Sequence, residues 1–393
     1  MSIGVAILSL AVLILVHEAG HFFVARAVGM TPRKFYIGFG PPLVKRMRGG
    51  VEYGIAALPL GGYVKIPGMH RPAPGDLRHS LKPEQQAELA PQLDELDAAL
   101  ERDDEPAALA LATQLEPHLP GNKMLEELEW ALAPDAYWRQ RVWKKVVVIA
   151  AGPLTNVAFA IVLLVVFFMI GGFKASRIVE TVSPDHPAAA AGLHAGDRIL
   201  AVAGHTVTPT RVGEAINATH GRSFTIVVLR GSHRLTLGPL RARLDQGSYR
   251  IGIVIKGLPG PGDSFPTACW HAVRVVGLFT STTVRSLGGL FVGQGTKNVS
   301  SAVGIVRVTS QAFKQSLQEF LGIIAEINLA LALLNLLPVL PLDGGHIVMS
   351  IVERLRGRAF SQVAYMRYSA IGLSLFIFLL YLGLRNDLGP GHS

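Results

Sequence analysis

Two histidines and a glutamate within five residues carry the strongest chemical signal in the chain. They belong to the stretch His17-Glu18-Ala19-Gly20-His21, inside an apolar run from Ile3 to Val28. Residues four apart project from one face of a helix, so both imidazoles can hold one Zn²⁺, with Glu18 as general base toward a water on the metal. The alternative is a set of polar side chains that line a helix bundle. Ionisable groups inside a membrane are costly and usually functional, which favours the metal site.

A catalytic zinc site normally takes three protein ligands, so a third ligand must come from elsewhere in the chain. The stretch 335–346, NLLPVLPLDGGH, offers the Asp343 carboxylate and the His346 imidazole at the end of another apolar segment. Its two prolines break a helix, and its two glycines permit close approach of backbones. Both side chains are candidates on these grounds.

With HEAGH in the first apolar segment and NLLPVLPLDGG in a late one, the chain resembles the site-2 protease family of intramembrane zinc metalloproteases, of the bacterial single-PDZ type. The resemblance implies that Asp343, rather than His346, is the third zinc ligand. It also implies that Asn335 of NLLP orients a substrate peptide group. Asn156 of the GPLTN stretch 152–156 would be a hydrogen-bonding group of the active site; the alternative is that this stretch is a packing kink between helices.

A glycine-rich stretch follows the first apolar run. Residues 51–65, VEYGIAALPLGGYVK, indicate strands around a turn at Gly61 and Gly62. By itself this pattern is typical of any structural hairpin. The resemblance implies a small membrane-associated sheet beside the active site, whose free edge could pair with an unwound substrate. Gly61, Gly62 and Tyr63 are therefore candidate substrate contacts.

Composition and charge favour a membrane enzyme. Of the 393 residues, 50% are hydrophobic and 17% charged, and the mean hydropathy is +0.37. The single cysteine, Cys269, excludes an intramolecular disulfide and a cysteine-cluster metal site. The net charge of +9 is explained by Lys and Arg beside membrane spans, so we expect no nucleic-acid partner.

Four apolar runs are long enough to cross a membrane. They cover Ile3 to Val28, Val146 to Ile170, Phe320 to Pro338, and about Ala370 to Leu384. Basic clusters at Arg33 to Arg48, Arg139 to Lys145 and Arg354 to Arg358 mark the cytoplasmic ends. These clusters predict a multi-pass protein of the bacterial inner (plasma) membrane, with both termini outside and the active site toward the cytoplasm.

An acidic segment departs from the family pattern. Between Glu84 and Glu129 there are 13 Asp or Glu against Arg102 and Lys123, a net charge of −11. Leucines recur at helical spacing from Leu89 to Leu100, which predicts a charged helical hairpin. It is either a solvated cytoplasmic insert, a gate over the active site, or a partner surface.

Residues from Arg177 to about Ile255 have the composition of a soluble β-rich domain. The pattern A-A-G-L-x-x-G-D-x-I-L-x-V within 190–202 resembles a PDZ domain, a class that takes extended peptides onto a sheet edge. Such a groove would either bind a peptide or block bulky substrates. Beyond a Pro/Gly linker, Trp270 to Leu290 and Ala302 to Leu317 are amphipathic and predict helices on the outer membrane face.

The expected fold is a polytopic α-helical membrane protein of about four transmembrane helices, with an inserted β-rich PDZ-like domain and a small membrane-associated β-sheet. The expected regions are residues 1–69 (first transmembrane helix, zinc motif and hairpin), 70–137 (acidic helical insert), 138–172 (second transmembrane helix), 173–258 (PDZ-like domain), 259–318 (linker and outer-face helices), and 319–393 (third and fourth transmembrane helices with the LDG motif).

The resemblance implies regulated proteolysis of single-span membrane proteins, such as anti-sigma factors or signal-peptide remnants, after another protease has trimmed them. The expected cofactor is Zn²⁺, and membrane lipid is the other expected partner. Two rival classes remain: a non-catalytic PDZ membrane adaptor and a cation transporter. The intact set of His17, Glu18, His21 and Asp343 disfavours the adaptor. A transporter should show inverted repeats and further ligands, which the sequence lacks.

Overall fold

The computed structural model describes residues 2–171, 173–245, 248–290, 301–357, 360 and 362–388. The chain divides into two compact units. One comprises Met1–Val166 and Pro266–Ser393, and the other comprises Phe167–Phe265. The first unit holds the apolar helices, a β-hairpin and the acidic insert, and the second is rich in strands.

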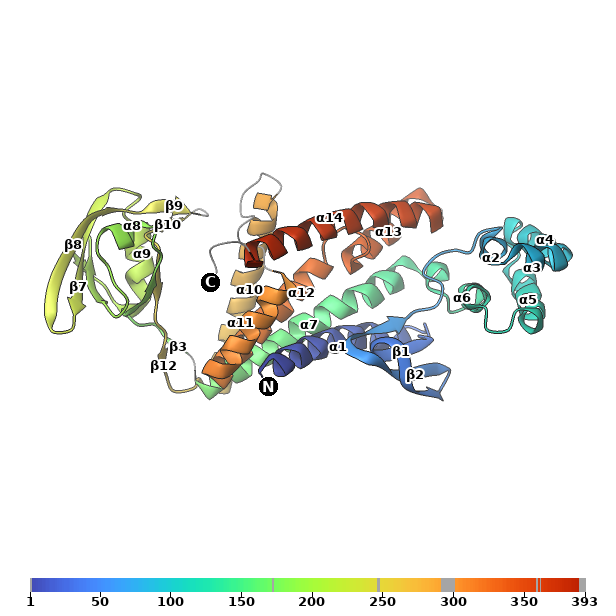
Figure 1. Ribbon diagram of the computed structural model, residues 1–393, viewed down its shortest axis with the longest axis horizontal. Helices are drawn as coiled ribbons and strands as arrows, with labels where there is room; N and C mark the ends of the chain where they lie inside the picture. The colour runs from blue at the N-terminus through green and yellow to red at the C-terminus, as the bar shows by residue number, and fades with distance from the viewer. Residues whose placement is uncertain are drawn as a thin grey trace. The chain divides into compact units, whose positions relative to one another are not determined.

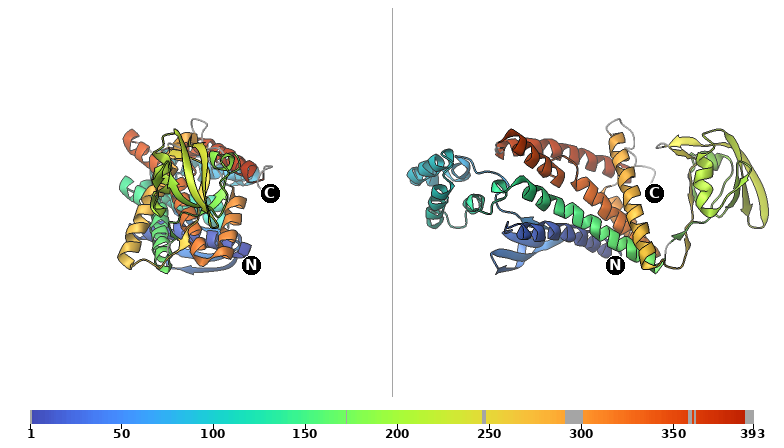
Figure 2. Two further views of the ribbon diagram at one scale, coloured as in Figure 1. Left: turned by 90° about the vertical axis from the view of Figure 1, so that its left-hand side faces the viewer. Right: turned by 180° about the vertical axis from the view of Figure 1, so that it is seen from behind.

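Four helices of the first unit are long and apolar enough to cross a membrane, within the part of the chain that the structure describes. They are α1 (Ser2–Ala27), α7 (Val142–Ile170), α12 (Leu317–Asn335) and α14 (Gln362–Leu388). Figures 1 and 2 show α1 and α7 lying side by side. The prediction of a polytopic, mainly helical membrane protein is confirmed at this level.

Apart from the helices of the acidic insert, the described part of this unit has three further α-helices: α10 (Phe265–Leu290), α11 (Ala302–Gln315) and α13 (Asp343–Arg356). Helix α11 packs against α1 and α12. Residues 291–300, which belong to the expected outer-face region, lie outside the described residues. Helix α13 begins at Asp343, directly after the irregular segment that contains Pro338 and Pro341, so two prolines separate it from α12.

A bent hairpin follows α1. It consists of β1 (Lys34–Arg48) and β2 (Val51–Lys65), which turn at Gly49 and Gly50 with φ of 58° and 76°. The turn expected at Gly61 and Gly62 is wrong, because two consecutive glycines with positive φ suit the tight turn at 49–50. Strand β2 instead continues and bends, so that residues 52–55 and 62–65 flank residues 34–37 on either side.

The acidic insert is a small helical bundle rather than the expected hairpin. Its helices are α2 (Asp76–Ser80), α3 (Pro83–Glu88), α4 (Ala90–Glu101), α5 (Glu105–Leu115) and α6 (Lys123–Leu132). Prolines lie in the first turns of α3, α4 and α5. Because proline is tolerated in a first turn and not in a helix interior, each one marks the beginning of a new helix. Leu93, Leu96 and Leu115 are fully buried in a core that the insert builds for itself.

The second unit is built from short strands around its own apolar core. A four-stranded sheet has the order β6 (His205–Thr206), β5 (Arg198–Val202), β7 (Ser223–Arg230), β8 (His233–Arg241), all antiparallel, and β11 (Ile253–Ile255) pairs with β4 (Val179–Val182). The remaining elements are β3 (Phe173–Lys174), α8 (Pro187–Ala190), α9 (Val212–Asn217), β9 (Arg243–Asp245), β10 (Ser248–Arg250) and β12 (Leu258–Pro259). Ile199, Ile226 and Val228 are fully buried in the core.

One ion pair anchors the loop before β5. Arg230 donates to both carboxylate oxygens of Asp197 at 2.8 Å, and the Asp197 side chain is 1% exposed. Burial alone would raise the pKa of this carboxyl, but the hydrogen bonds from Arg230 and from the backbone of His194 outweigh it and hold the pKa below its ordinary value. The carboxylate therefore stays ionised at neutral pH and fixes the turn into the sheet.

Candidate metal centre

Helix α1 places the two histidines as their spacing requires. His17 and His21 are one turn apart and each is only 6% exposed, and their Nε2 atoms lie 3.2 Å from one another. The helix therefore presents two imidazole nitrogens at one buried point.

The third group comes from the start of α13, more than 300 residues away in the chain. Asp343 Oδ2 lies 3.1 Å from His17 Nε2 and 3.4 Å from His21 Nε2. Among the described residues, His17, His21 and Asp343 form the one cluster of His, Cys, Asp or Glu compact enough to hold a metal ion. His346, the competing ligand, lines the same cavity but is not part of this cluster.

The spacing of the three atoms fits a zinc ion. Ligands about 2.0–2.2 Å from a tetrahedral zinc lie about 3.3–3.6 Å from each other, close to the observed 3.1–3.4 Å. Asp343 Oδ2 is buried and accepts no hydrogen bond from any residue that the structure describes. A buried carboxylate oxygen without a partner is costly, and a cation between the three atoms would satisfy it.

Groups behind the imidazoles fix their orientation. His21 Nδ1 lies 2.9 Å from the Val148 carbonyl oxygen. Because a carbonyl can only accept, Nδ1 carries the proton, and Nε2 keeps its lone pair for a metal. The Asn156 side-chain amide lies 3.3 Å from His17 Nδ1, and Asn328 Nδ2 donates to the Asn156 backbone carbonyl at 2.7 Å. Asn156, fully buried, thus touches a candidate ligand and does not line the cavity.

Two glycines allow α1 and α7 to approach closely. A Cβ on Gly152 would meet His21 Nε2, His21 Cε1 at 2.6 Å and His17 Cε1 at 2.8 Å. A Cβ on Gly20 would strike Thr155 Oγ1 and the Ala151 carbonyl of α7. Gly152 was not predicted as a site residue from the sequence, although it begins the GPLTN stretch. Its position after a basic cluster in an apolar helix was the available signal.

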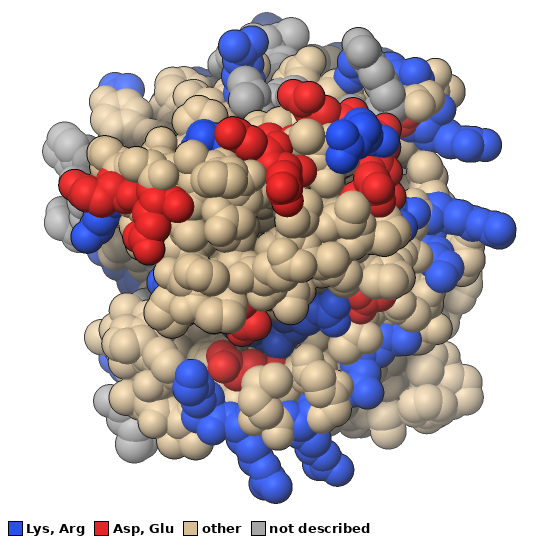
Figure 3. All heavy atoms as spheres, turned by 90° about the vertical axis from the view of Figure 1, so that its right-hand side faces the viewer, with Lys and Arg blue, Asp and Glu red and all other residues tan. Residues whose placement is uncertain are grey.

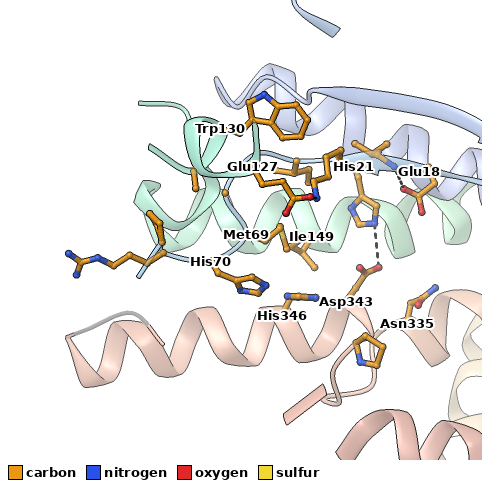
Figure 4. Close-up of a pocket in the computed structure, with 18 of the residues that line it drawn as sticks. Glu18, His21, Met69, His70, Glu127, Trp130, Ile149, Asn335, Asp343 and His346 are labelled. Carbon is orange, nitrogen blue, oxygen red and sulfur yellow. Dashed lines mark hydrogen bonds and ion pairs between the residues drawn. The ribbon is translucent and has the colours of Figure 1, made fainter. Parts of the chain in front are cut away.

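The backbone of β2 holds the candidate base. The Val64 amide donates to Glu18 Oε2 at 3.0 Å, so the outer edge of residues 62–65 faces α1. Figure 4 shows Glu18 and His21 projecting from the same helix toward Asp343, which comes from the opposite wall. A carboxylate held beside, but outside, the three-ligand cluster is placed to move protons rather than to bind the metal.

A cavity of about 620 Å³ opens beside this cluster. Asn335 lines it, as do Val64, Lys65 and His346. Burial lowers the pKa of the His346 imidazole to about 4, so this ring is uncharged at neutral pH. The three candidate substrate contacts of the glycine-rich stretch, Gly61, Gly62 and Tyr63, do not line the cavity. Gly61 packs on Ile14 and Phe39, and Gly62 packs on the Tyr36 carbonyl. The Tyr63 ring stacks on the Tyr36 ring.

Comparison with known proteins assigns this arrangement to a family of peptidases. The family model described as peptidase family M50 matches residues 5–379. A "Putative zinc metalloprotease" of Xylella fastidiosa (strain 9a5c) is 25% identical, over 98% of each chain. Relatives of the same description from Brucella suis and Mesorhizobium japonicum are 28% and 30% identical, over 96% of this chain and over 93% and 96% of their own.

Proposed function

Because the chain belongs to peptidase family M50, the site-2 protease family, we propose that it is an intramembrane zinc metalloprotease. Its substrates would be other membrane proteins, cleaved in or near their transmembrane segments after another protease has trimmed them. One observation supports this most directly: three candidate ligand atoms lie 3.1–3.4 Å apart beside Glu18, and two of them belong to α1, a helix apolar enough to span a bilayer.

In this proposal, His17, His21 and Asp343 hold Zn²⁺. When bound, the ion supplies Lewis-acid chemistry, which polarises a peptide carbonyl and makes a water molecule more acidic. Glu18 takes a proton from the attacking water at its carboxylate and returns it to the nitrogen of the leaving amine. The Val64 amide keeps this carboxylate directed into the cavity.

A transmembrane helix hides its peptide bonds within its own hydrogen bonds, so the substrate must unwind locally. We propose that the edge of β2 at Val64 and Lys65, which line the cavity, receives the unwound segment as an added strand. In this arrangement Asn335 contacts a freed peptide group directly. Gly61, Gly62 and Tyr63 determine the bend of β2 and do not contact the substrate. Asn156 orients the His17 imidazole.

We further propose that the active site faces the cytoplasm and both termini lie outside, in a bacterial inner membrane. The basic residues that follow α1, precede α7 and end α13 favour this orientation. The second unit is then a PDZ-like domain outside the membrane, which restrains access to the active site. Regulated proteolysis of single-span proteins is the biological role that these assignments support.

The test compares Glu18→Gln with Asp343→Ala in purified protein. If the proposal is right, Glu18→Gln keeps stoichiometric zinc and loses cleavage of a transmembrane-helix reporter, because Glu18 is a base and not a ligand. Asp343→Ala loses both zinc and cleavage. Cleavage by the Glu18→Gln variant, measured by the appearance of the product fragment, would refute the assigned mechanism.

A further inference from the structure

Helix α6 of the acidic insert forms one wall of the cavity beside the metal cluster. Met124, Glu127, Leu128 and Ala131 all line this cavity together with His17, His21 and Asp343. Their spacing of i, i+3, i+4 and i+7 means that one complete face of α6 is turned toward the candidate active site. Figure 4 shows Glu127 extending from this helix toward the side of the cavity where His21 lies.

The position of α6 is fixed from both sides. Asn122 caps its first turn by accepting from the Met124 and Leu125 amides, and Leu125 and Leu132 anchor its opposite face in the core of the insert. The two chain segments that connect the insert to the rest of the unit are held together by a hydrogen bond, in which the Tyr137 amide donates to the Pro67 carbonyl at 2.9 Å. This wall is therefore a built part of the cavity.

Glu127 is the one acidic side chain that α6 contributes to the cavity. It pairs with Lys65 Nζ at 2.7 Å, and the side chains of Lys65 and Glu127 are 38% and 51% exposed. Exposed ion pairs contribute little to stability, so another cation can replace Lys65 at small cost. Lys65 directly follows Val64, and a strand added along the edge of β2 would pass this pair.

We propose that Glu127 is a specificity-determining residue, which binds a Lys or Arg of the substrate on the cytoplasmic side of the scissile bond. This inference rests on the proposed function. Segments that leave a membrane toward the cytoplasm carry Lys and Arg at that boundary. Met124 and Trp130, which are half-buried and line the cavity, offer an apolar surface for the aliphatic stem of such a side chain, and Glu127 meets its charge.

The surroundings of α6 match a basic occupant. Figure 3 shows the face toward which the insert projects, with Asp and Glu side chains gathered over its upper part. The insert segment from Glu84 to Glu129 carries a net charge of −11. Besides Lys65, Arg71 is the other Lys or Arg among the described residues that line the cavity, and it is already paired with Asp103. An approaching Lys or Arg is therefore drawn toward this mouth, more strongly at low salt.

The first experiment measures binding, so that it does not depend on turnover. Transmembrane peptides with Lys-Lys or Gln-Gln at the cytoplasmic boundary are titrated into Glu18→Gln protein in lipid nanodiscs. We expect the Lys-Lys peptide to bind about 5–10-fold more tightly, and the added change Glu127→Gln to remove most of this preference. Glu95→Gln, an equal loss of charge at an exposed position of α4 outside the cavity, should leave it unchanged.

The second experiment measures cleavage of reporters with the same two boundaries. Parent protein that cleaves both reporters equally, or a preference that survives Glu127→Gln, overturns the inference and leaves the protease intact. An equal loss of cleavage for both reporters in Glu127→Gln would make α6 only a steric wall and also overturns it. Failure of the parent to cleave either reporter contradicts the proposed function instead, while the binding ratio still decides the role of Glu127.

Discussion

Gly152 is the residue on which the approach of α7 to the metal cluster depends. Its missing side chain leaves the space that the two imidazoles occupy. Gly152→Ala should push His17 and His21 away from Asp343, and we expect zinc affinity to fall by about 10–100-fold, as for changes behind metal ligands in other sites. Competition with a chelator of known zinc affinity measures this loss.

The matched control is Gly4→Ala, a change in α1 whose Cβ would meet nothing within 4 Å. Alanine also favours a helix over glycine, so this control should fold at least as well as the parent. Equal zinc affinity in Gly152→Ala and Gly4→Ala would show that the two rings can shift without cost, and that the close approach of α7 has no part in metal binding.

The third ligand is a separate prediction at the residue scale. Asp343→Asn removes the charge of the oxygen nearest both Nε2 atoms, so zinc per protein should fall from about one to well below one. His346→Ala, in the same cavity but outside the cluster, should keep full zinc occupancy. Metal analysis of both variants after dialysis measures the zinc content. Full zinc in Asp343→Asn together with loss of zinc in His346→Ala would make His346 the ligand.

Some of these residues could be predicted from sequence and others could not. His17, Glu18 and His21 are local in the chain, so helix geometry alone brings them to one point. The residues alone left both Asp343 and His346 open, and only their three-dimensional placement separates them. The Val64 amide carries no side-chain signal, and its contact with Glu18 depends on how β2 bends.

At the scale of elements, a buried network ties α13 to α7. Lys145 Nζ lies 3.2 Å from Glu353 Oε2, with side chains 5% and 10% exposed. Tyr137 Oη and Ser350 Oγ lie 3.1 Å apart beside this pair, and the Phe360 amide donates to Glu353 Oε1 at 2.9 Å. Because α13 begins at Asp343, this network sets where the third candidate ligand lies.

We expect Lys145→Met to destabilise the first unit by about 3–5 kcal/mol, because it leaves the Glu353 carboxylate buried without its cation. The double variant Lys145→Met, Glu353→Gln should recover part of that loss, since the uncompensated charge is gone. Unfolding in detergent micelles measures both. If the double variant is no more stable than the single one, the pair contributes packing rather than charge.

The elements themselves were predictable where a pattern is long and regular. Hydropathy alone indicates the four apolar helices, since a run of some twenty apolar residues has few other uses. The insert was harder: leucine spacing predicted helix correctly, but the prolines at 83, 91 and 106 divide it into shorter helices. The sequence has two Gly-Gly pairs near the hairpin, at 49–50 and 61–62. Sequence spacing alone does not show which pair has positive φ at both residues and therefore forms the turn.

At the scale of the whole molecule, the chemistry and the strand-rich unit are separate. Every residue of the candidate metal cluster and of its cavity lies in the first unit, and the second unit has its own apolar core. Two units with separate cores can lose or keep their structure independently. The second unit should therefore affect which substrates arrive and not how a peptide bond is broken.

Replacing residues 177–255 with a short Gly/Ser linker tests this division. Zinc content should be unchanged, because no candidate ligand is removed. Cleavage of a reporter with a short outer segment should persist, and cleavage of one with a long outer domain should persist or increase, because a restraint on access is gone. Product formation from the two reporters, with Glu18→Gln in the same deletion as the inactive control, gives the measurement. Loss of cleavage of both reporters at full zinc occupancy would instead make the second unit an obligatory docking site, which substrates must engage before they reach the cavity.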